Sequence, residues 1–325
     1  MKITRRSAVG GILASAIVRP ALAALEPVTY LFPAPVFLPA FMPFHLAAKR
    51  NYFTANGVDV TFRTGRGGAD VAIQVGASNA DLGGGLGETS IIVRPNGLAV
   101  RAVAQLGSHP LFELVTRKES NVKSFADLRG KKLGVIGYQD TGYYALLAVL
   151  ASSGLKRTDL EIQSVGPAGV TQLMIAKSLD GIMATPEWSD TIESAGIALD
   201  YYPIEKAFPA MAQAILASDK IIKERPAAVR GFVKSVMQAV RDCMADPAAA
   251  ARDFVAAVPQ HAGKEAEMER ILRRYVTQVY ATTPVSALGT FDPERVKAVQ
   301  KFYLDDQIIQ TAVPVQDLYT NEFVS

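Results

Sequence analysis

The chain has 325 residues, of which 34 are Lys or Arg, 31 are Asp or Glu, and 49% are hydrophobic. This length suffices for two α/β lobes with sizeable cores. Four of the basic residues, Lys2, Arg5, Arg6 and Arg19, lie within residues 1–23, so the rest of the chain has 30 basic and 31 acidic residues and a net charge of −1. Because this part of the chain has no basic surplus, we expect it to bind neither nucleic acid nor an anionic membrane surface.

The N-terminal segment has the composition of a secretory signal peptide. Arg5 and Arg6 precede the apolar stretch Ala8–Val18, and the small residues Ala21 and Ala23 mark a cleavage site. The apolar stretch is too short to span a membrane as a helix. The paired arginines suggest the twin-arginine (Tat) route, but the bulky apolar residues that usually follow them are missing, so Sec export stays equally open. We expect a periplasmic protein.

Strands and helices alternate over the first part of the chain. The expected elements, in order, are a strand at Val28–Phe32, a helix at Ala40–Phe53, a strand at Val58–Phe62, a helix, a short edge strand toward Leu82, a glycine-rich loop, a helix, and strands within "VRAVAQL" and "FELVTR". This alternation predicts parallel sheets covered by helices. Beyond Ser218 the pattern is helical, with Pro in the first turn of several helices.

The stretch "KKLGVIGYQDTGYYALLAVLASSGL" predicts a binding site at a helix start. The apolar run Leu133–Ile136 predicts a buried strand, the cluster Gly137–Gly142 a tight loop, and the following residues a buried helix. The first N–H groups of a helix lack internal partners and carry the positive end of its dipole. We therefore expect acceptor atoms of a ligand at this position.

Several segments carry a resemblance to a known family. They are "LAAKRNYFTANGVDV", "GGADVAIQVGASNADLG", "LVTRKESNVKSFADLRGKKLGV" and "GVTQLMIAKSLDGIMATPEW", and "SFADLRGKKLGV" is the most specific of them. In this order they resemble the NMT1/THI5-like substrate-binding proteins of ABC importers, which include binders of sulfonates, taurine, nitrate and pyrimidine precursors. The resemblance extends over essentially the whole chain after residue 23.

The resemblance implies an α/β protein with the type II periplasmic binding protein fold. In this fold two α/β lobes enclose a central cleft and are joined by a two-strand hinge, here the strands near "FELVTR" and "AQAIL". Lobe 1 would comprise residues 24–117 and 212–325, and lobe 2 residues 118–211. Because ligands of open α/β sheets bind beyond the carboxyl ends of the strands, we expect four loops at the cleft. These loops are Pro33–Pro39, Gly85–Ser90, Gly137–Tyr143 and Thr185–Ser189.

Ten residues of these loops are candidates for ligand contact. They are Phe37, Glu88, Thr89, Gln139, Asp140, Thr141, Gly142, Tyr143, Glu187 and Trp188. Tyr143 and Tyr144 are consecutive in a helix and point in different directions, so the sequence leaves open which of them faces the cleft.

Most candidates also have a purely structural interpretation. Trp188, in an expected loop, either stacks on the ligand or covers the lobe, and Phe37 either contacts the ligand or packs. Glu88 and Glu187 are either solvated acids or acceptors for the ligand. Asp140 is expected to cap its helix, and this is either its only role or is combined with a ligand contact.

The charges of the expected loops indicate the ligand's character. They contain Glu88, Asp140 and Glu187 but no Lys or Arg. A charged anion in a dry cleft usually requires donors such as Arg supplies, whereas carboxylates beside aromatic rings favour a planar, neutral or donor-rich molecule. We therefore favour a pyrimidine-like nitrogen heterocycle, with a sulfonate, nitrate or an aromatic acid as alternatives.

The residues argue against an enzyme. His45, His109 and His261 are scattered, and no G-x-S-x-G motif occurs. The related pyrimidine synthases use a Cys-rich motif and a His, whereas this chain has the single Cys243, which cannot form an internal disulfide. We expect no cofactor and no metal. The expected partners are a small-molecule ligand and an ABC permease, with the protein a monomer, and a periplasmic sensor with the same fold stays an alternative.

We predict that the exported protein begins near Ala24 or Leu25, because the apolar stretch is short and ends at small residues. Intact-mass analysis of the periplasmic fraction should show this N-terminus. Membrane-bound protein that retains residues 1–23 would contradict the prediction.

Overall fold

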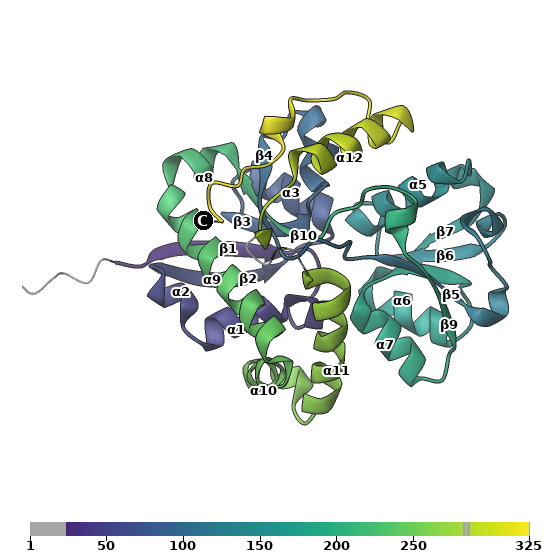
Figure 1. Cartoon of the computed structure of the whole chain (residues 1–325), viewed down its shortest axis with the longest axis horizontal. Coiled ribbons are helices and arrows are strands. Elements are labelled where there is room, and N and C mark those ends of the chain that lie inside the picture. Colours follow the sequence, from purple (N-terminus) through teal and green to yellow (C-terminus); the bar gives the residue numbers. More distant parts are fainter. Residues whose placement is uncertain (1–23, 282–283, 285–286, 325) are drawn as a thin grey trace, which may run out of the picture.

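The computed structural model describes residues 24–281, 284 and 287–324, and the predicted signal peptide lies outside this range. The described chain forms two lobes side by side, each built on a five-stranded sheet (Figure 1). No helix in these residues combines the length and the apolar composition needed to cross a membrane.

Both sheets are mixed rather than parallel. The first has the order β2 (Val58–Thr64), β1 (Glu26–Phe32), β3 (Leu82–Leu86), β10 (Gln213–Ser218), β4 (Val100–Gln105). The second has the order β7 (Glu161–Ser164), β6 (Lys132–Val135), β8 (Gly181–Ala184), β5 (Glu113–Arg117), β9 (Leu199–Tyr202). In each sheet three neighbouring strands are parallel, while β10 and β5 run antiparallel to both of their neighbours.

Helices cover both faces of each sheet (Figure 1). The first lobe contains α1 (Met42–Lys49), α2 (Tyr52–Ala55), α3 (Gly68–Gly76), α4 (Thr89–Val93), α8 (Asp219–Glu224), α9 (Pro226–Ala245), α10 (Pro247–Ala257), α11 (Glu265–Tyr275) and α12 (Pro293–Asp305). The second contains α5 (Thr141–Ser152), α6 (Gly166–Ile175) and α7 (Pro186–Ser194). The helix expected over residues 40–53 is two helices, because Asn51 adopts a left-handed conformation with φ 59°.

The chain crosses between the lobes twice, through residues 106–112 before β5 and through residues 203–212 before β10. The expected lobe boundary at residue 117 grouped β5 with the first lobe. However, β5 pairs with β8 and β9 in the second sheet. The pattern of a buried strand is the same in either sheet, so the sequence could not decide this point.

Alternation along β1 divides the core. Val28, Tyr30 and Phe32 point to the face covered by α9 and α10, whereas Leu31 points to the face covered by α3. Tyr30 stacks on Phe232 with ring centroids 4.9 Å apart. The core on the α3 face continues into the second lobe. Each fully buried ring contributes about 1.5–3 kcal/mol to folding.

The glycines after Leu82 form a central strand and not the edge strand and loop expected from the sequence. Gly83, Gly84 and Gly85 lie within β3, between β1 and β10. A Cβ at Gly83 would lie 2.3 Å from Val71 Cγ1 of α3. These positions require glycine because the neighbouring elements approach the backbone too closely for a side chain.

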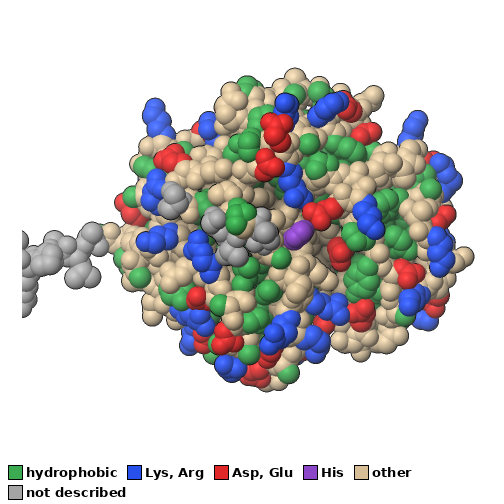
Figure 2. Space-filling view, in the orientation of Figure 1, with side chains coloured by type: hydrophobic (Ala, Val, Ile, Leu, Met, Phe, Trp, Pro, Cys, Tyr) green, Lys and Arg blue, Asp and Glu red, His purple; other side chains and the backbone are tan. Residues whose placement is uncertain are grey.

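The charged surface agrees with the balanced composition. On the face shown in Figure 2, side chains of Lys and Arg are interspersed with those of Asp and Glu over both lobes.

Gly107, in the first crossing, should be required for stability. A Cβ there would lie 1.8 Å from the Val279 carbonyl oxygen of the π-helical turn Val276–Tyr280. Since backbone must move to accommodate it, Gly107→Ala should reduce the free energy of unfolding by about 1–3 kcal/mol in urea denaturation.

Gly137→Ala is the matched control, because the nearest atom to its added Cβ would be Ser164 Oγ at 3.8 Å. Equal stability of the two variants would show that the π-helical turn does not approach Gly107 too closely for a side chain.

Candidate functional site

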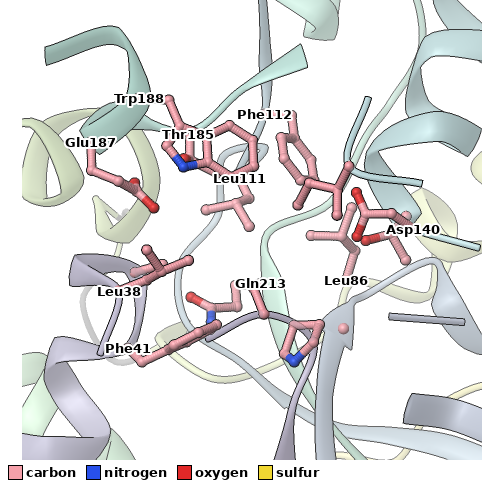
Figure 3. Close-up of a pocket in the computed structure, with 16 residues that line it drawn as sticks. Leu38, Phe41, Leu86, Leu111, Phe112, Asp140, Thr185, Glu187, Trp188 and Gln213 are labelled. Carbon is pink, nitrogen blue, oxygen red and sulfur yellow. The ribbon is translucent and has the colours of Figure 1, made fainter. Parts of the chain in front are cut away.

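A small cavity, of about 40 Å³ when the open space at its mouth is left out, lies between the lobes. Its lining residues come from both lobes and from the crossings: Pro33, Ala34, Leu38, Ala40, Phe41, Gly85, Leu86, Leu111, Phe112, Ile136, Asp140, Thr141, Thr185, Glu187, Trp188 and Gln213. Figure 3 shows Glu187 and Asp140 on opposite sides of the cavity, with Trp188 and Phe112 between them. The wall is largely apolar, and its ionisable groups are two carboxyls.

Two histidines fix the loop that follows β1. His45 Nε2 donates to the Val36 carbonyl oxygen and His261 Nε2 to that of Phe37, both at 2.7 Å. Burial lowers the pKa of His45, which favours its neutral form. These side chains therefore position the loop that carries Leu38 into the cavity.

Asp140 lies where the starts of two helices from different lobes, α5 and α3, meet. Its carboxylate accepts the Gly142 N–H at 3.0 Å and so caps α5. Beside it, Ala69 N donates to the Gln139 carbonyl oxygen at 3.2 Å. Burial raises the pKa of Asp140 to about 6. The lobes are therefore in direct contact at this end of the cleft.

Glu187 and Trp188 lie in the first turn of α7, which begins at Pro186 after the N-cap Thr185. The expected loop is thus a helix, since Pro is favourable in the first turn. Glu187 is 3% exposed, and Tyr275 of α11 donates its hydroxyl to Oε2 at 2.5 Å. Glu187 Oε1 has no hydrogen-bond partner among the described residues, and burial raises the pKa of this carboxyl.

Aromatic residues that the sequence did not single out complete the cavity. Phe112 lies at the end of the first crossing, with its ring centroid 6.3 Å from that of Trp188, and Phe41 lies on the opposite wall (Figure 3). Gln213, the first residue of β10, is 2% exposed, and its Oε1 is unpartnered in the part of the chain that the structure describes. A polar residue at the start of the otherwise apolar run "AILA" was the one available signal.

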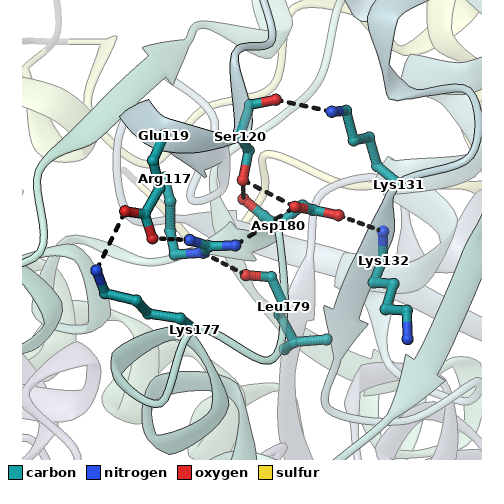
Figure 4. Close-up of polar contacts among 8 residues, drawn as sticks. All are labelled: Arg117, Glu119, Ser120, Lys131, Lys132, Lys177, Leu179 and Asp180. Carbon is teal, nitrogen blue, oxygen red and sulfur yellow. Dashed lines mark hydrogen bonds and ion pairs between the residues drawn. The ribbon is translucent and has the colours of Figure 1, made fainter.

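Four arginines, Arg63, Arg66, Arg94 and Arg117, lie in segments that flank the expected loops, and none of them lines this inner cavity. Arg117 donates from Nε to the Leu179 carbonyl oxygen at 2.7 Å and forms ion pairs with Glu119 and Asp180 (Figure 4). In the same network Asp180 also accepts hydrogen bonds from Ser120 and from the Lys132 N–H (Figure 4).

The other three flanking arginines, Arg63, Arg66 and Arg94, also lie outside the inner cavity. Arg94 is paired with Asp219 at 2.6 Å, and Arg63 is exposed on β2. Arg66 lines a second, outer cavity, where its side chain is 82% exposed.

The expected residues separate into three groups. Asp140, Thr141, Glu187 and Trp188 line the inner cavity. Gln139 and Phe37 line two outer cavities that flank it. Glu88, Thr89, Gly142 and Tyr143 line none of these three cavities.

This last group has structural contacts instead. Thr89 Oγ1 accepts the Leu86 N–H, the Gly142 N–H is capped by Asp140, and the ring of Tyr143 packs edge-on against that of Tyr138. Glu88 lies beside the second crossing, where its Oε2 accepts the Met211 N–H at 3.3 Å.

Comparison with known proteins identifies similar sequences. The family model described as NMT1/THI5 like matches residues 38–250. The riboflavin-binding protein RibY of Chloroflexus aurantiacus is 25% identical over 87% of this chain and 82% of its own. The 4-amino-5-hydroxymethyl-2-methylpyrimidine phosphate synthase THI11 of Saccharomyces cerevisiae is 24% identical over 72% of each chain.

Solved structures share the fold. The alkanesulfonate-binding protein SsuA from Xanthomonas axonopodis pv. citri, bound to MOPS, has a TM-score of 0.72 and 16% identity over 92% of this chain and 99% of its own. The nitrate-binding protein NrtA from Synechocystis PCC 6803 has a TM-score of 0.66 and 12% identity over 92% and 87%. The two-lobe α/β fold expected from the sequence is confirmed.

Glu88→Gln should stabilise the protein progressively as pH rises. Burial raises the pKa of Glu88 from 4.5 to about 8, so between these values the native state holds a proton that the unfolded chain releases. The contribution of neutral Glu88 to the free energy of unfolding is fully present below pH 4.5 and is lost as pH rises through about 8. Because Gln cannot ionise, its advantage over the wild type should grow by on the order of a few kcal/mol from about pH 5 to about pH 9.

Urea denaturation across this pH range measures the effect, with the exposed Glu224→Gln as the control. A pH-independent difference for Glu88→Gln would show that Glu88 titrates normally.

Proposed function

Because this chain belongs to the NMT1/THI5-like family, we propose that it is an extracytoplasmic solute-binding protein that delivers a small molecule to an ABC importer. It would capture its ligand between the two lobes and present the closed form to the permease. The family match, the two-lobe fold and the cavity between the lobes support this proposal.

The proposed ligand is a planar, neutral or donor-rich molecule, with a pyrimidine-like nitrogen heterocycle favoured. The observation that carries this choice is a cavity wall with two buried carboxyl groups and aromatic rings but no Lys or Arg. A buried acceptor without a partner costs about 1–3 kcal/mol. A ligand with ring N–H or amino groups removes this cost at Glu187 Oε1 and at Gln213 Oε1, whereas an anion would add negative charge beside Asp140 and Glu187.

We assign a role to each polar or aromatic element of the site. The ring of the ligand lies against Trp188 and Phe112, with Phe41 on the opposite wall. Glu187 and Gln213 accept hydrogen bonds from its donors. Asp140 and Thr141 contact it from the start of α5, and Gln139 and Phe37 lie at the two outer openings.

The names of two relatives agree with a heterocyclic ligand. RibY is named for riboflavin, whose flat ring system carries an N–H donor, and the yeast relative is named for an aminopyrimidine product. SsuA and NrtA, named for alkanesulfonate and nitrate, share the fold at lower identity.

Binding without chemistry fits the described residues better than synthesis. Cys243 is fully buried, and burial raises the pKa of its thiol, so it is not poised as a nucleophile. His45 and His261 are used to hold backbone carbonyls. The described chain contains no cluster of three or more His, Cys, Asp or Glu that could hold a metal ion.

We propose hinge closure as the mechanism. The lobes are joined by the two crossings, so they can rotate about this edge while each sheet stays intact. A ligand promotes closure only through contacts that it makes better in the closed form. Contacts from Gln213 and Phe41 on one side and from Glu187 and Trp188 on the other meet this condition. We propose that the protein acts as a periplasmic monomer.

The ligand class is testable by calorimetry with lumichrome, 4-amino-2-methylpyrimidine, methanesulfonate and nitrate. We expect a heterocycle to bind and the two anions not to bind. Glu187→Gln should weaken heterocycle binding by about 10- to 100-fold, because a hydrogen bond to a charged group contributes about 1.5–3 kcal/mol.

Glu161→Gln is the control, since Glu161 is an exposed carboxylate on β7 of the same lobe and does not line the cavity. Tight binding of methanesulfonate or nitrate that Glu187→Gln leaves intact would refute the heterocycle and favour an anion receptor.

A further inference from the structure

Helix α11 of the first lobe reaches across the cleft to α7 of the second (Figure 1). Asp190 of α7 accepts two hydrogen bonds from Arg270, from Nε and Nη2, each at 2.8 Å. One turn further along, Arg274 Nη2 donates to Glu193 Oε2 at 2.6 Å. At the end of α11, Tyr275 donates to Glu187 as described above.

The spacing of these residues places them on facing stripes. Glu187, Asp190 and Glu193 recur every three residues on α7, and Arg270 and Arg274 are four residues apart on α11, so each set lies on one face of its helix. Arg274 Nη1 also lies 3.4 Å from the hydroxyl of Tyr201 on β9. We use the name α7–α11 clasp for six residues of these two helices: Glu187, Asp190, Glu193, Arg270, Arg274 and Tyr275.

Burial makes the clasp specific. The side chain of Asp190 is only 4% exposed, so its charge is costly without the two-point contact from Arg270. A planar guanidinium that meets a carboxylate at two points fixes direction as well as distance. Rotation of α7 about its axis would separate this pair and the Tyr275 contact together.

The clasp adjoins the two residues of α7 that line the inner cavity, Glu187 and Trp188. Glu187 belongs to both, because Tyr275 donates to its Oε2 while the same side chain lines the inner cavity and its Oε1 has no partner among the described residues. Trp188 follows it in the chain and shares an outer cavity with Met268 and Ile271 of α11. The orientation of α7 relative to α11 therefore sets the positions of Glu187 and Trp188.

We propose that Arg270, Arg274 and Tyr275 are positioning residues: they hold α7 in the orientation that presents Glu187 and Trp188 to the ligand, and in doing so they hold the lobes together before a ligand arrives. The ligand-facing part of this proposal rests on the proposed function, whereas the contact between the lobes does not.

Trp188 is the only Trp of the chain and reports on the clasp directly. It is 5% exposed in the closed cleft. In ligand-free protein, Arg270→Gln and Asp190→Asn should each shift the Trp188 emission to longer wavelength and increase its quenching by acrylamide, because α7 leaves α11 and water enters. The lumichrome affinity, measured by calorimetry, should fall by about three- to tenfold for each variant.

The double variant Arg270→Gln/Asp190→Asn should be no worse than either single variant, because the two side chains act as one pair. Tyr275→Phe should weaken lumichrome binding while it retains the ring, since only the hydrogen bond to Glu187 is lost. Arg273→Gln is the matched control: Arg273 lies on the same helix, but its partner is Glu269 within α11. It should leave emission and affinity unchanged.

Wild-type Trp188 emission in Arg270→Gln and Asp190→Asn, even with a lowered melting temperature, would overturn the clasp and leave a merely stabilising ion pair. An equal effect of Arg273→Gln would also overturn it. If lumichrome does not bind the wild type but the ligand-free emission shifts as expected, the ligand assignment fails and the clasp stands.

Discussion

The closed cleft depends on carboxylates of the second lobe that take their hydrogen-bond donors from the first. Glu187 accepts the Tyr275 hydroxyl, and Asp190 accepts two hydrogen bonds from the Arg270 guanidinium. Burying a carboxylate is costly unless donors meet it. Since both carboxylates are 3% exposed, the contact between the lobes buries these groups and also supplies donors that meet them.

The same arrangement leaves two acceptor atoms without hydrogen-bond partners in the described part of the chain. After the first lobe has supplied its donors, Glu187 Oε1 and Gln213 Oε1 are still unpartnered among the described residues. In the proposed function, this acceptor surplus inside an apolar, aromatic wall would favour a flat molecule that brings its own donors. The same surplus would disfavour anions, because like charges in a desolvated site repel. The proposed specificity and the proposed closure would then depend on one set of carboxylates.

Local sequence patterns were sufficient for the parts of the site that lie at element starts. The tight loop Gly137–Gly142 before α5 suggested Asp140 and Thr141, and the loops implied by the resemblance contained Glu187 and Trp188; all four line the inner cavity. Glu88 could not be placed, because whether a side chain after β3 faces the cleft or the second crossing depends on how the lobes pack. Tyr275 was also inaccessible, since its contact with Glu187 joins residues 88 positions apart in sequence.

A clasp between the lobes has consequences of opposite sign for a receptor. Every contact that stabilises the ligand-free closed form raises the apparent affinity, because less of the ligand's binding energy is used to close the lobes. It also reduces the difference between ligand-free and ligand-bound populations that a permease must recognise. The composition of the clasp limits this second effect. The side chain of Arg270 is 50% exposed, so water screens part of its attraction to Asp190, and the free energy of the pair stays well below that of a fully buried one. Glu187 Oε1 is still unpartnered when the clasp is complete, so a ligand that donates to it adds a contact that the ligand-free closed form lacks.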